Sequence, residues 1–171
     1  MGIYFNPNNG SFRQAVRSQI YIDKTGLIKH MNKLLGTENK CVALSHARRF
    51  GKSQAAGMLD AYYSLGSDSR ELFAPFEIAK DPEFELHLNK YNVIHLDVSS
   101  FEGTYKDKIV AGMKEAIYRE LKLEITDLLG VENAIASILA DVYQKTGSQL
   151  VIIIDEWDYV VRNYTDKTDV V

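Results

Sequence analysis

Three apolar segments along the chain have the pattern of β-strands: residues 41–45 (CVALS), 91–100 (YNVIHLDVSS) and 149–161 (QLVIIIDEWDYVV). The first is a short, β-branched run of the kind that parallel sheets bury on both faces. The second ends in polar residues, and the third has five consecutive apolar residues before Asp155. We therefore expect core strands at all three segments, the last of them central and fully buried.

Helical periodicity follows each of the first two segments. One helix is predicted from Lys52 to about residue 65, and two more over about 105–123 and 131–145. Their apolar positions recur every three or four residues: Ala55, Met58, Leu59 and Tyr62; Ile109, Met113, Ile117 and Leu121; Ile135, Leu139 and Tyr143. Gly147 marks the end of the last helix.

The remaining segments predict shorter elements. Residues 11–36 combine two helices with a short extended piece at 20–22. Either Asp23 or Thr25 could cap the second of these helices, and Asp23 fits a cap best. Residues 66–90 have the pattern of a loop with short helices.

Strands that alternate with helices predict an α/β fold with a parallel sheet. A chain of 171 residues can bury one core, so we expect a single domain over residues 1–171. Residues 1–36 form its helical and extended lead-in. No internal repeat or low-complexity tract is visible.

The composition excludes disordered and fibrous proteins. The chain is 46% hydrophobic and 25% charged with a net charge of −3, which is typical of a globular protein. It has no broad positive field, so direct nucleic-acid binding is not expected, although a local basic patch is still allowed. Cys41 is the single cysteine, which excludes an internal disulfide, and we expect it to be buried. No signal peptide or membrane span is visible, so we expect a cytoplasmic protein without a membrane partner.

The stretch LSHARRFGKSQ, residues 44–54, has the chemistry of a phosphate-binding loop (Walker A). Gly51 allows close backbone approach, Lys52 reaches the β and γ phosphates, and the Ser53 hydroxyl is a ligand for Mg²⁺. A helix that starts here directs its positive dipole end at the phosphates. The predicted nucleotide-binding residues are His46, Ala47, Arg48, Arg49, Phe50, Gly51, Lys52, Ser53 and Gln54.

Three residues of this loop keep two interpretations. His46 occupies the position of the first glycine of the usual pattern, where it either contacts phosphate or is simply exposed at the loop surface. Arg48 and Arg49 either clamp phosphate oxygens and stack on the base, or pair with surface carboxylates.

The segment VIIIDE supplies an acidic counterpart, the Walker B pattern. Its apolar strand delivers Asp155 to the shell of a Mg²⁺ ion, and Glu156 can orient or activate the attacking water. The alternative is a strand end that reaches solvent. We predict that Lys52 and Glu156 are catalytic residues and that Ser53 and Asp155 are metal ligands. The two motifs together predict ATP and Mg²⁺ as cofactors.

The chain resembles the AAA-ATPase-like family of bacterial proteins, which carry a nuclease-type domain after the ATPase. The resemblance runs through YIDKTGLI (21–28), RRFGKS (48–53), ELFAPFEI (71–78), YNVIHLDVSS (91–100) and VIIIDEWD (151–158). It implies a P-loop NTPase fold, a three-layer α/β/α sandwich, with the roles given above for the Walker residues. It also implies that YIDKTGLI lies near the nucleotide, on its adenine side, and that a nuclease-like domain is fused to or associated with the longer protein.

This sequence departs from the family pattern at His46 and Ala47, which replace an arginine and a proline, and at Gln54, which replaces an apolar residue. In the family a further strand follows Walker B, whereas residues 159–171 are short and polar. We therefore expect an incomplete domain, truncated after the Walker B strand, that binds nucleotide better than it hydrolyses it. Its oligomeric state is left open.

Three functions remain open. The first is an ATP-binding, Mg²⁺-dependent NTPase module that couples binding and hydrolysis to a downstream effector. The second is a nucleotide-gated switch or interaction module with little hydrolysis. The third, a small-molecule kinase, needs an acceptor pocket for which no signature is visible.

Several polar and aromatic residues have ordinary structural interpretations. Asp97 and Ser99 lie at a strand end and are expected to form a turn or cap. Trp157 and Tyr159 are expected to pack beneath the acidic pair. The histidines have no ligand spacing: His30, His87 and His95.

Overall fold

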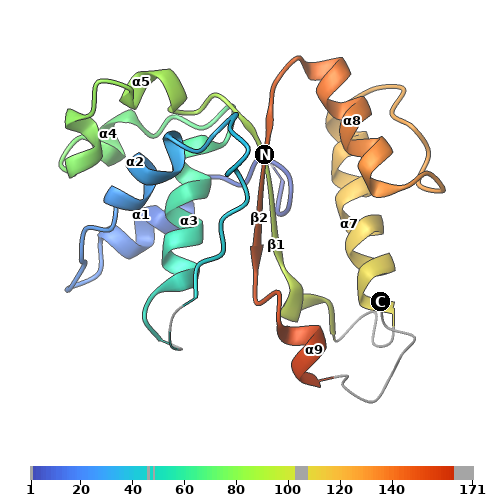
Figure 1. Cartoon of the computed structure of the whole chain (residues 1–171), viewed down its shortest axis with the longest axis horizontal. Helices are drawn as coiled ribbons and strands as arrows, with labels where there is room; N and C mark the ends of the chain where they lie inside the picture. Colours follow the sequence, from blue (N-terminus) through green and yellow to red (C-terminus); the bar gives the residue numbers. More distant parts are fainter. Residues whose placement is uncertain (1, 46, 48, 103–107, 164–171) are drawn as a thin grey trace. The chain divides into compact units, whose positions relative to one another are not determined.

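The computed structural model describes residues 2–45, 47, 49–102 and 108–163 (Figure 1). The described residues fall into two units that are considered separately below. One unit is Pro7–Tyr91, and the other joins Met1–Asn6 to Asn92–Val171. We name them the loop unit and the sheet unit.

The sheet unit is built on two parallel strands, β1 (Asn92–Asp97) and β2 (Leu150–Asp155). Their register places Asn92 opposite Leu150 and Asp97 opposite Asp155, so the two aspartates end neighbouring strands. The amino-terminal residues line the other edge of β1, where Asn6 N–H donates to the Val93 carbonyl at 2.8 Å. Parallel strands require a crossover, which the intervening helices provide.

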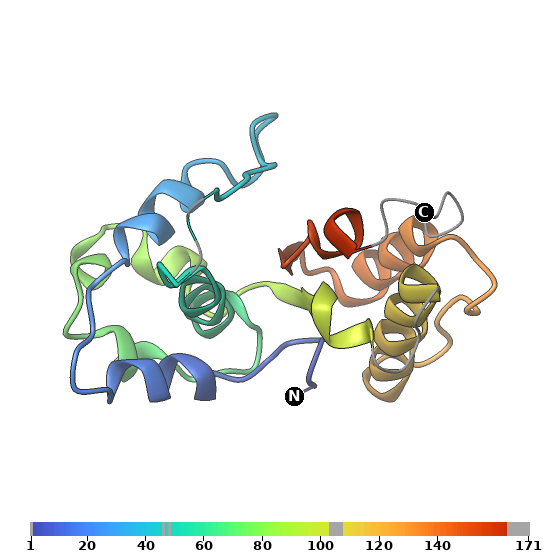
Figure 2. The ribbon, with the colours of Figure 1, turned by 90° about the horizontal axis from the view of Figure 1, so that it is seen from below.

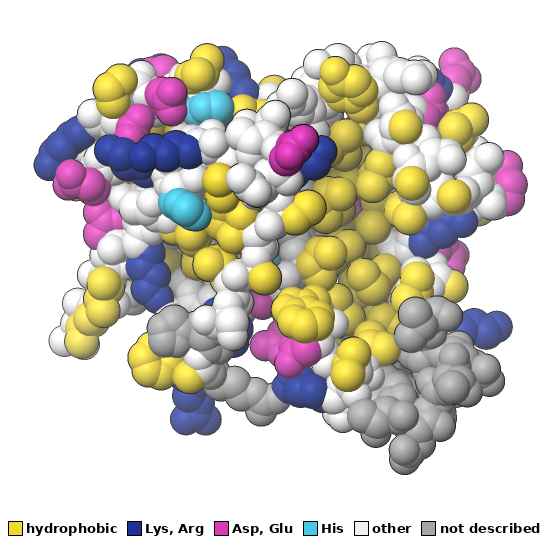
Figure 3. Space-filling view, viewed as in Figure 1, with side chains coloured by type: hydrophobic (Ala, Val, Ile, Leu, Met, Phe, Trp, Pro, Cys, Tyr) yellow, Lys and Arg dark blue, Asp and Glu magenta, His cyan; other side chains and the backbone are white. Residues whose placement is uncertain are grey.

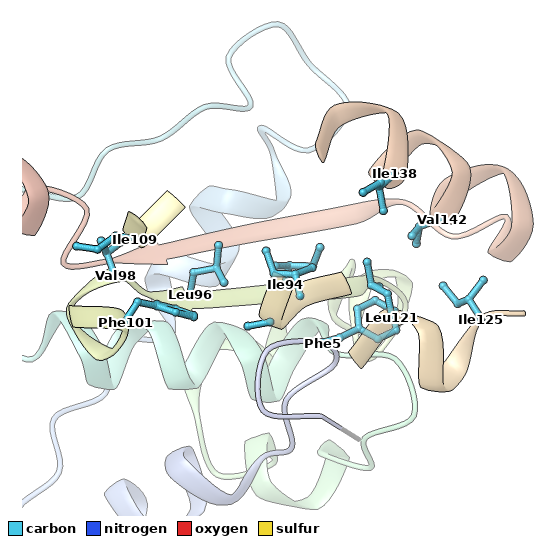
Figure 4. Packing of buried hydrophobic residues seen from close by; sticks show 12 residues of the cluster. Phe5, Ile94, Leu96, Val98, Phe101, Ile109, Leu121, Ile125, Ile138 and Val142 are labelled. Carbon is cyan, nitrogen blue, oxygen red and sulfur yellow. The ribbon is translucent and has the colours of Figure 1, made fainter. Parts of the chain in front are cut away.

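Two helices of the sheet unit, α7 (Ile109–Glu124) and α8 (Ile135–Thr146), lie side by side in both ribbon views (Figures 1 and 2). Together with η2 (Val98–Phe101) and β1 they enclose the core shown in Figure 4. Its labelled members are Phe5, Ile94, Leu96, Val98, Phe101, Ile109, Leu121, Ile125, Ile138 and Val142. A short helix, α9 (Tyr159–Asn163), follows β2.

Glu120 on α7 fixes the amino-terminal segment. Its carboxylate accepts backbone hydrogen bonds from Ile3, Tyr4 and Phe5 at 2.8–2.9 Å. Because these N–H groups all point at one carboxylate, the segment is held beside β1, and Phe5 enters the core.

The loop unit is helical. It contains α1 (Gly10–Val16), α2 (Gly26–Asn32), α3 (Lys52–Tyr63), α4 (Arg70–Phe73), η1 (Glu77–Lys80) and α5 (Phe84–His87). Aromatic rings fill its interior, with Phe12 and Phe73 stacked at 4.8 Å between centroids. Burial raises the pKa of Tyr62 to about 12, and its hydroxyl donates to the Phe84 carbonyl at 2.8 Å.

Much of the predicted element pattern is confirmed. The strands at residues 92–97 and 150–155 form and pair in parallel, which supports an α/β protein. The helix predicted from Lys52 ends two residues early, and the one predicted over 131–145 begins four residues late. The helix predicted over 105–123 is confirmed from Ile109 on, while its residues 105–107 lie outside the described part of the chain. Gly147 ends α8 with a φ of 66°. The α/β/α sandwich and the single domain stay predictions.

Two expectations about strands are wrong. Residues 41–45 form no strand, and Cys41 is exposed rather than buried. An apolar run becomes a strand only beside another strand, and the described part of the loop unit contains none.

The second correction concerns β2, which is not fully buried. Ile152 and Ile154 face the same side of the sheet as Ile94 and Leu96, their register partners on β1. The β1 residues are buried, whereas Ile152 and Ile154 are each 50% exposed. Figure 3 shows hydrophobic side chains gathered over the region where Figure 1 draws β2 and α8. The helices therefore cover β1 better than β2.

Candidate functional site

The Gly-Lys-Ser sequence lies at the first turn of α3, as predicted. Gly51 precedes the helix with a φ of 80°, a left-handed conformation that glycine adopts without steric cost. Its carbonyl accepts the Ala55 N–H at 3.0 Å, which closes the first turn. Lys52 and Ser53 are the first two residues of the helix, half-buried and exposed respectively.

The rest of α3 is anchored in the interior of the loop unit. Met58, Tyr62 and Tyr63 are buried, and Gly57 lets α1 approach closely. A Cβ atom on Gly57 would lie 2.8 Å from Ser11 Oγ. The later residues of α3 therefore anchor the helix, while Ser53 and Gln54 in its first turn are exposed.

The other predicted loop residues divide into described and undescribed ones. Ala47, Arg49, Phe50 and Gln54 are exposed, and Arg49 has a φ of 68°. Left-handed backbone is costly for a residue with a Cβ, and such strained residues recur at functional sites. His46 and Arg48 lie outside the described residues, so their two interpretations stay open. The expected strand before the loop is absent, as reported above.

Lys24 is a neighbour of the loop that belongs to neither Walker motif. Its Nζ atom donates to the Phe50 carbonyl at 2.6 Å. A Cβ atom on Gly51 would lie 2.7 Å from the same Nζ. The sequence signal was the YIDKTGLI string, expected near the nucleotide through the family resemblance, but no property of Lys24 alone distinguishes it from other lysines.

Asp23 and Thr25 attach the segment around Lys24 to η1. Asp23 accepts hydrogen bonds from the N–H groups of Thr25 at 2.7 Å and Glu77 at 3.1 Å. Burial alone would raise the pKa of Asp23, but these bonds outweigh it and hold the pKa below its usual value. The N-cap position of α2 belongs to Thr25, so Asp23 joins two segments instead of serving as the N-cap residue.

The acidic pair lies at the carboxyl end of β2. Asp155 is the last strand residue, and one of its carboxylate oxygens accepts the Glu156 N–H at 3.0 Å. Glu156 itself has a φ of 52°, so like Arg49 it is a non-glycine residue in left-handed backbone. The carboxyl ends of parallel strands are the usual place for ligands in α/β sheets.

Arg162 on α9 pairs with acidic residues that follow β2. Its guanidinium contacts Glu156 Oε2 at 2.6 Å and Asp158 Oδ2 at 2.9 Å. The three side chains are 32–44% exposed, so water screens the pairs. Glu156 is therefore held by a counter-charge in this conformation.

The neighbouring residues partly follow expectation. Asp97 forms the predicted turn, because its carboxylate accepts from the Ser99 N–H at 2.9 Å. Tyr159 packs against the core of the sheet unit. Trp157, however, is 65% exposed, so its expected packing beneath the acidic pair is wrong. The chain turns at Glu156, and the Tyr159 N–H donates to its carbonyl.

The site residues thus fall into two groups in different units. In the loop unit the structure brings Lys24 against Phe50 and Gly51, and in the sheet unit it brings Glu156 together with Arg162. Among the described residues, no three His, Cys, Asp or Glu side chains are clustered for metal binding. No helix in the described ranges is long and apolar enough to cross a membrane.

The chain is an α/β protein, because helices connect its two parallel strands. It also has a sequence signature of nucleotide-binding proteins, the Gly-Lys-Ser sequence at the start of a helix. The model of the AAA-ATPase-like family, described as predicted AAA-ATPase, matches residues 11–171. The chain belongs to this family, and the family description implies nucleotide binding. No curated protein matches the chain, and no solved structure does.

Proposed function

We propose that the chain is an ATP-binding, Mg²⁺-dependent NTPase module. The observation that carries this proposal is the Gly51-Lys52-Ser53 sequence at the start of α3, in a member of a family described as predicted AAA-ATPase. Residues 46–54 would bind the phosphates, and Asp155 and Glu156 would act at the carboxyl end of β2. The chemistry of their side chains suits both groups of residues, 46–54 and 155–156, to one nucleotide.

The phosphate-binding role rests on the start of α3. This helix has twelve residues, and its first N–H groups have no intrahelical acceptors. Such groups, with the helix dipole, favour an anion at this end, and Lys52 adds a full positive charge. Gly51 contributes no side chain that would keep a phosphate from the backbone.

The metal-binding role fits the donors of two residues. The Ser53 hydroxyl and the Asp155 carboxylate are oxygen donors, which Mg²⁺ prefers. When bound, Mg²⁺ would neutralise negative charge on the phosphate oxygens. Glu156 would then orient the attacking water and accept its proton.

Two wider features belong to the same proposal. The family resemblance supports a P-loop α/β/α sandwich and a nuclease-like effector coupled to the ATPase. The parallel pairing of β1 with β2 is compatible with the α/β/α sandwich. The nuclease-like effector rests on the resemblance alone.

Isothermal titration calorimetry with ATP and Mg²⁺ tests the binding function. Lys52→Ala should abolish measurable binding, because it removes the charged donor to the β and γ phosphates. Lys33→Ala is the matched control, since Lys33 is exposed at the end of α2 and has no assigned role. Equal affinity of Lys52→Ala and the unaltered chain would overturn the proposal.

A nucleotide-gated switch with little hydrolysis is the second candidate. The ion pair between Arg162 and Glu156 favours it, because the guanidinium occupies a carboxylate oxygen that would otherwise accept a hydrogen bond from the attacking water. The switch predicts ATP binding with negligible phosphate release. Steady phosphate release that disappears in Glu156→Gln would count against the switch and support the NTPase.

A further inference from the structure

Lys24 lies against the backbone of the proposed phosphate loop. Its ammonium donates to the Phe50 carbonyl at 2.6 Å, one residue before Gly51. The space that a Gly51 side chain would need is occupied by the same ammonium, 2.7 Å from the ideal Cβ position. The charged end of Lys24 is therefore next to the residue that opens α3.

The backbone on both sides of Lys24 is fixed. Asp23 binds the N–H groups of Thr25 and Glu77 through its carboxylate. Thr25 is fully buried, and its hydroxyl accepts the Ile78 N–H at 3.3 Å. Since both neighbours of Lys24 are attached to η1, its side chain extends to the loop from a constrained start.

The chemistry of an ammonium leaves Lys24 with capacity for a ligand. An ammonium has three N–H donors, and a carbonyl oxygen occupies one of them. The Phe50 carbonyl is neutral, so this contact does not neutralise the positive charge. An anion bound at the start of α3 would thus meet a cation already directed to that place.

We propose that Lys24 is a second cation of the nucleotide site, which donates to phosphate oxygens while it holds the Phe50 carbonyl. This inference rests on the proposed function, because it assigns Lys24 to the phosphates of the same nucleotide. Its contribution grows with the number of phosphates, since the interaction is with phosphate charge and not with the base or ribose.

The test is the affinity of the whole chain for ATP, ADP and AMP by calorimetry, in Lys24→Met and in Lys24→Arg. Lys24→Met keeps the apolar stem and removes the charge. We expect it to weaken ATP binding about tenfold, with a smaller loss for ADP and the least for AMP. Lys24→Arg should restore most of the loss, and Lys33→Met, the matched control on α2, should change nothing.

Two outcomes overturn the inference while the proposed function stands. The first is wild-type ATP affinity in Lys24→Met. The second is an equal loss for all three nucleotides with a lowered melting temperature, which indicates structural support only. If Lys24→Met fails to fold, Lys24→Gln supplies the same comparison, and a folded Lys24→Gln variant that keeps the unaltered preference for ATP over AMP also overturns the inference. Absence of ATP binding by the unaltered chain would instead overturn the proposed function and this inference together.

Discussion

At the scale of single residues, the unusual backbone conformations coincide with the proposed chemistry. Positive φ angles occur at Arg49 and Gly51 before α3, and at Glu156 after β2. Glycine tolerates this conformation, but at Arg49 and Glu156 it costs free energy that surrounding contacts must offset. Positive φ angles also occur at residues without an assigned role, such as Asn89 and Asp127, so the conformation alone does not identify a site.

Gly51→Ala should lower both stability and nucleotide affinity. The φ of 80° should cost about 1 kcal/mol with a Cβ present. The new methyl group must also displace Lys24 Nζ, so we expect ATP affinity to fall about tenfold.

Gly36→Ala is the matched control for this substitution. Gly36 has a φ of 73°, and nothing lies within 4 Å of its added Cβ. It should lose similar stability in urea unfolding and keep its ATP affinity in calorimetry. Equal ATP affinity in Gly51→Ala and Gly36→Ala would contradict the role given to Gly51.

At the scale of secondary structure, the sequence predicted helices better than strands. The apolar spacing of α3, α7 and α8 is a local property, and a helix satisfies its backbone hydrogen bonds within itself. Residues 41–45 have an equally good strand pattern but form no strand. A strand depends on a neighbour, and no pattern within the segment says whether that neighbour is present.

The attachment of Asp23 to η1 predicts a dependence of stability on pH. Because the folded pKa of Asp23 is depressed, its contribution is complete above the unfolded pKa of about 3.9 and is lost as the pH falls through the folded value. Asp23→Asn should cost about 1 kcal/mol of unfolding free energy near pH 7. The difference from the unaltered chain should shrink as the pH falls through the depressed folded pKa of Asp23.

Urea unfolding followed by circular dichroism at several pH values checks this expectation. Asp68→Asn is the control, because Asp68 is an exposed aspartate of the same unit. A stability difference for Asp23→Asn that persists unchanged at low pH would contradict the role of its ionised carboxylate.

The unequal burial of β1 and β2 predicts unequal effects of the same substitution. Ile94 and Ile152 are register partners on one sheet face, but Ile94 is 1% exposed and Ile152 is 50% exposed. Ile94→Thr should cost about 2–3 kcal/mol, because it removes apolar contacts and buries a hydroxyl. Ile152→Thr should change stability by less than about 0.5 kcal/mol.

Unfolding monitored through Trp157, the single tryptophan, measures both variants within the sheet unit. Threonine keeps the β-branched shape in each case, so strand propensity is matched. Equal losses of stability would show that β2 is covered as well as β1.

At the scale of the whole molecule, sequence and structure contribute different parts of the site. The order of motifs in the sequence predicted Lys52 and Ser53 at a helix start and Asp155 at a strand end, and the structure has them there. The contact of Lys24 with the loop could not be predicted, because it joins residues 26 positions apart through side-chain geometry. The two groups of site residues belong to separate units, so their common function is a proposal from chemistry and family membership.

The most direct measurement of that common function is a double-mutant cycle in ATP affinity, by calorimetry with and without Mg²⁺, using Ser53→Ala, Asp155→Asn and their combination. If both residues hold one metal ion on one nucleotide, each single variant should lose about tenfold in the affinity that depends on Mg²⁺. The double variant should then lose little more, because either change already removes the shared ion. Losses that simply add, or ATP binding that does not respond to Mg²⁺ in the unaltered chain, would contradict the account.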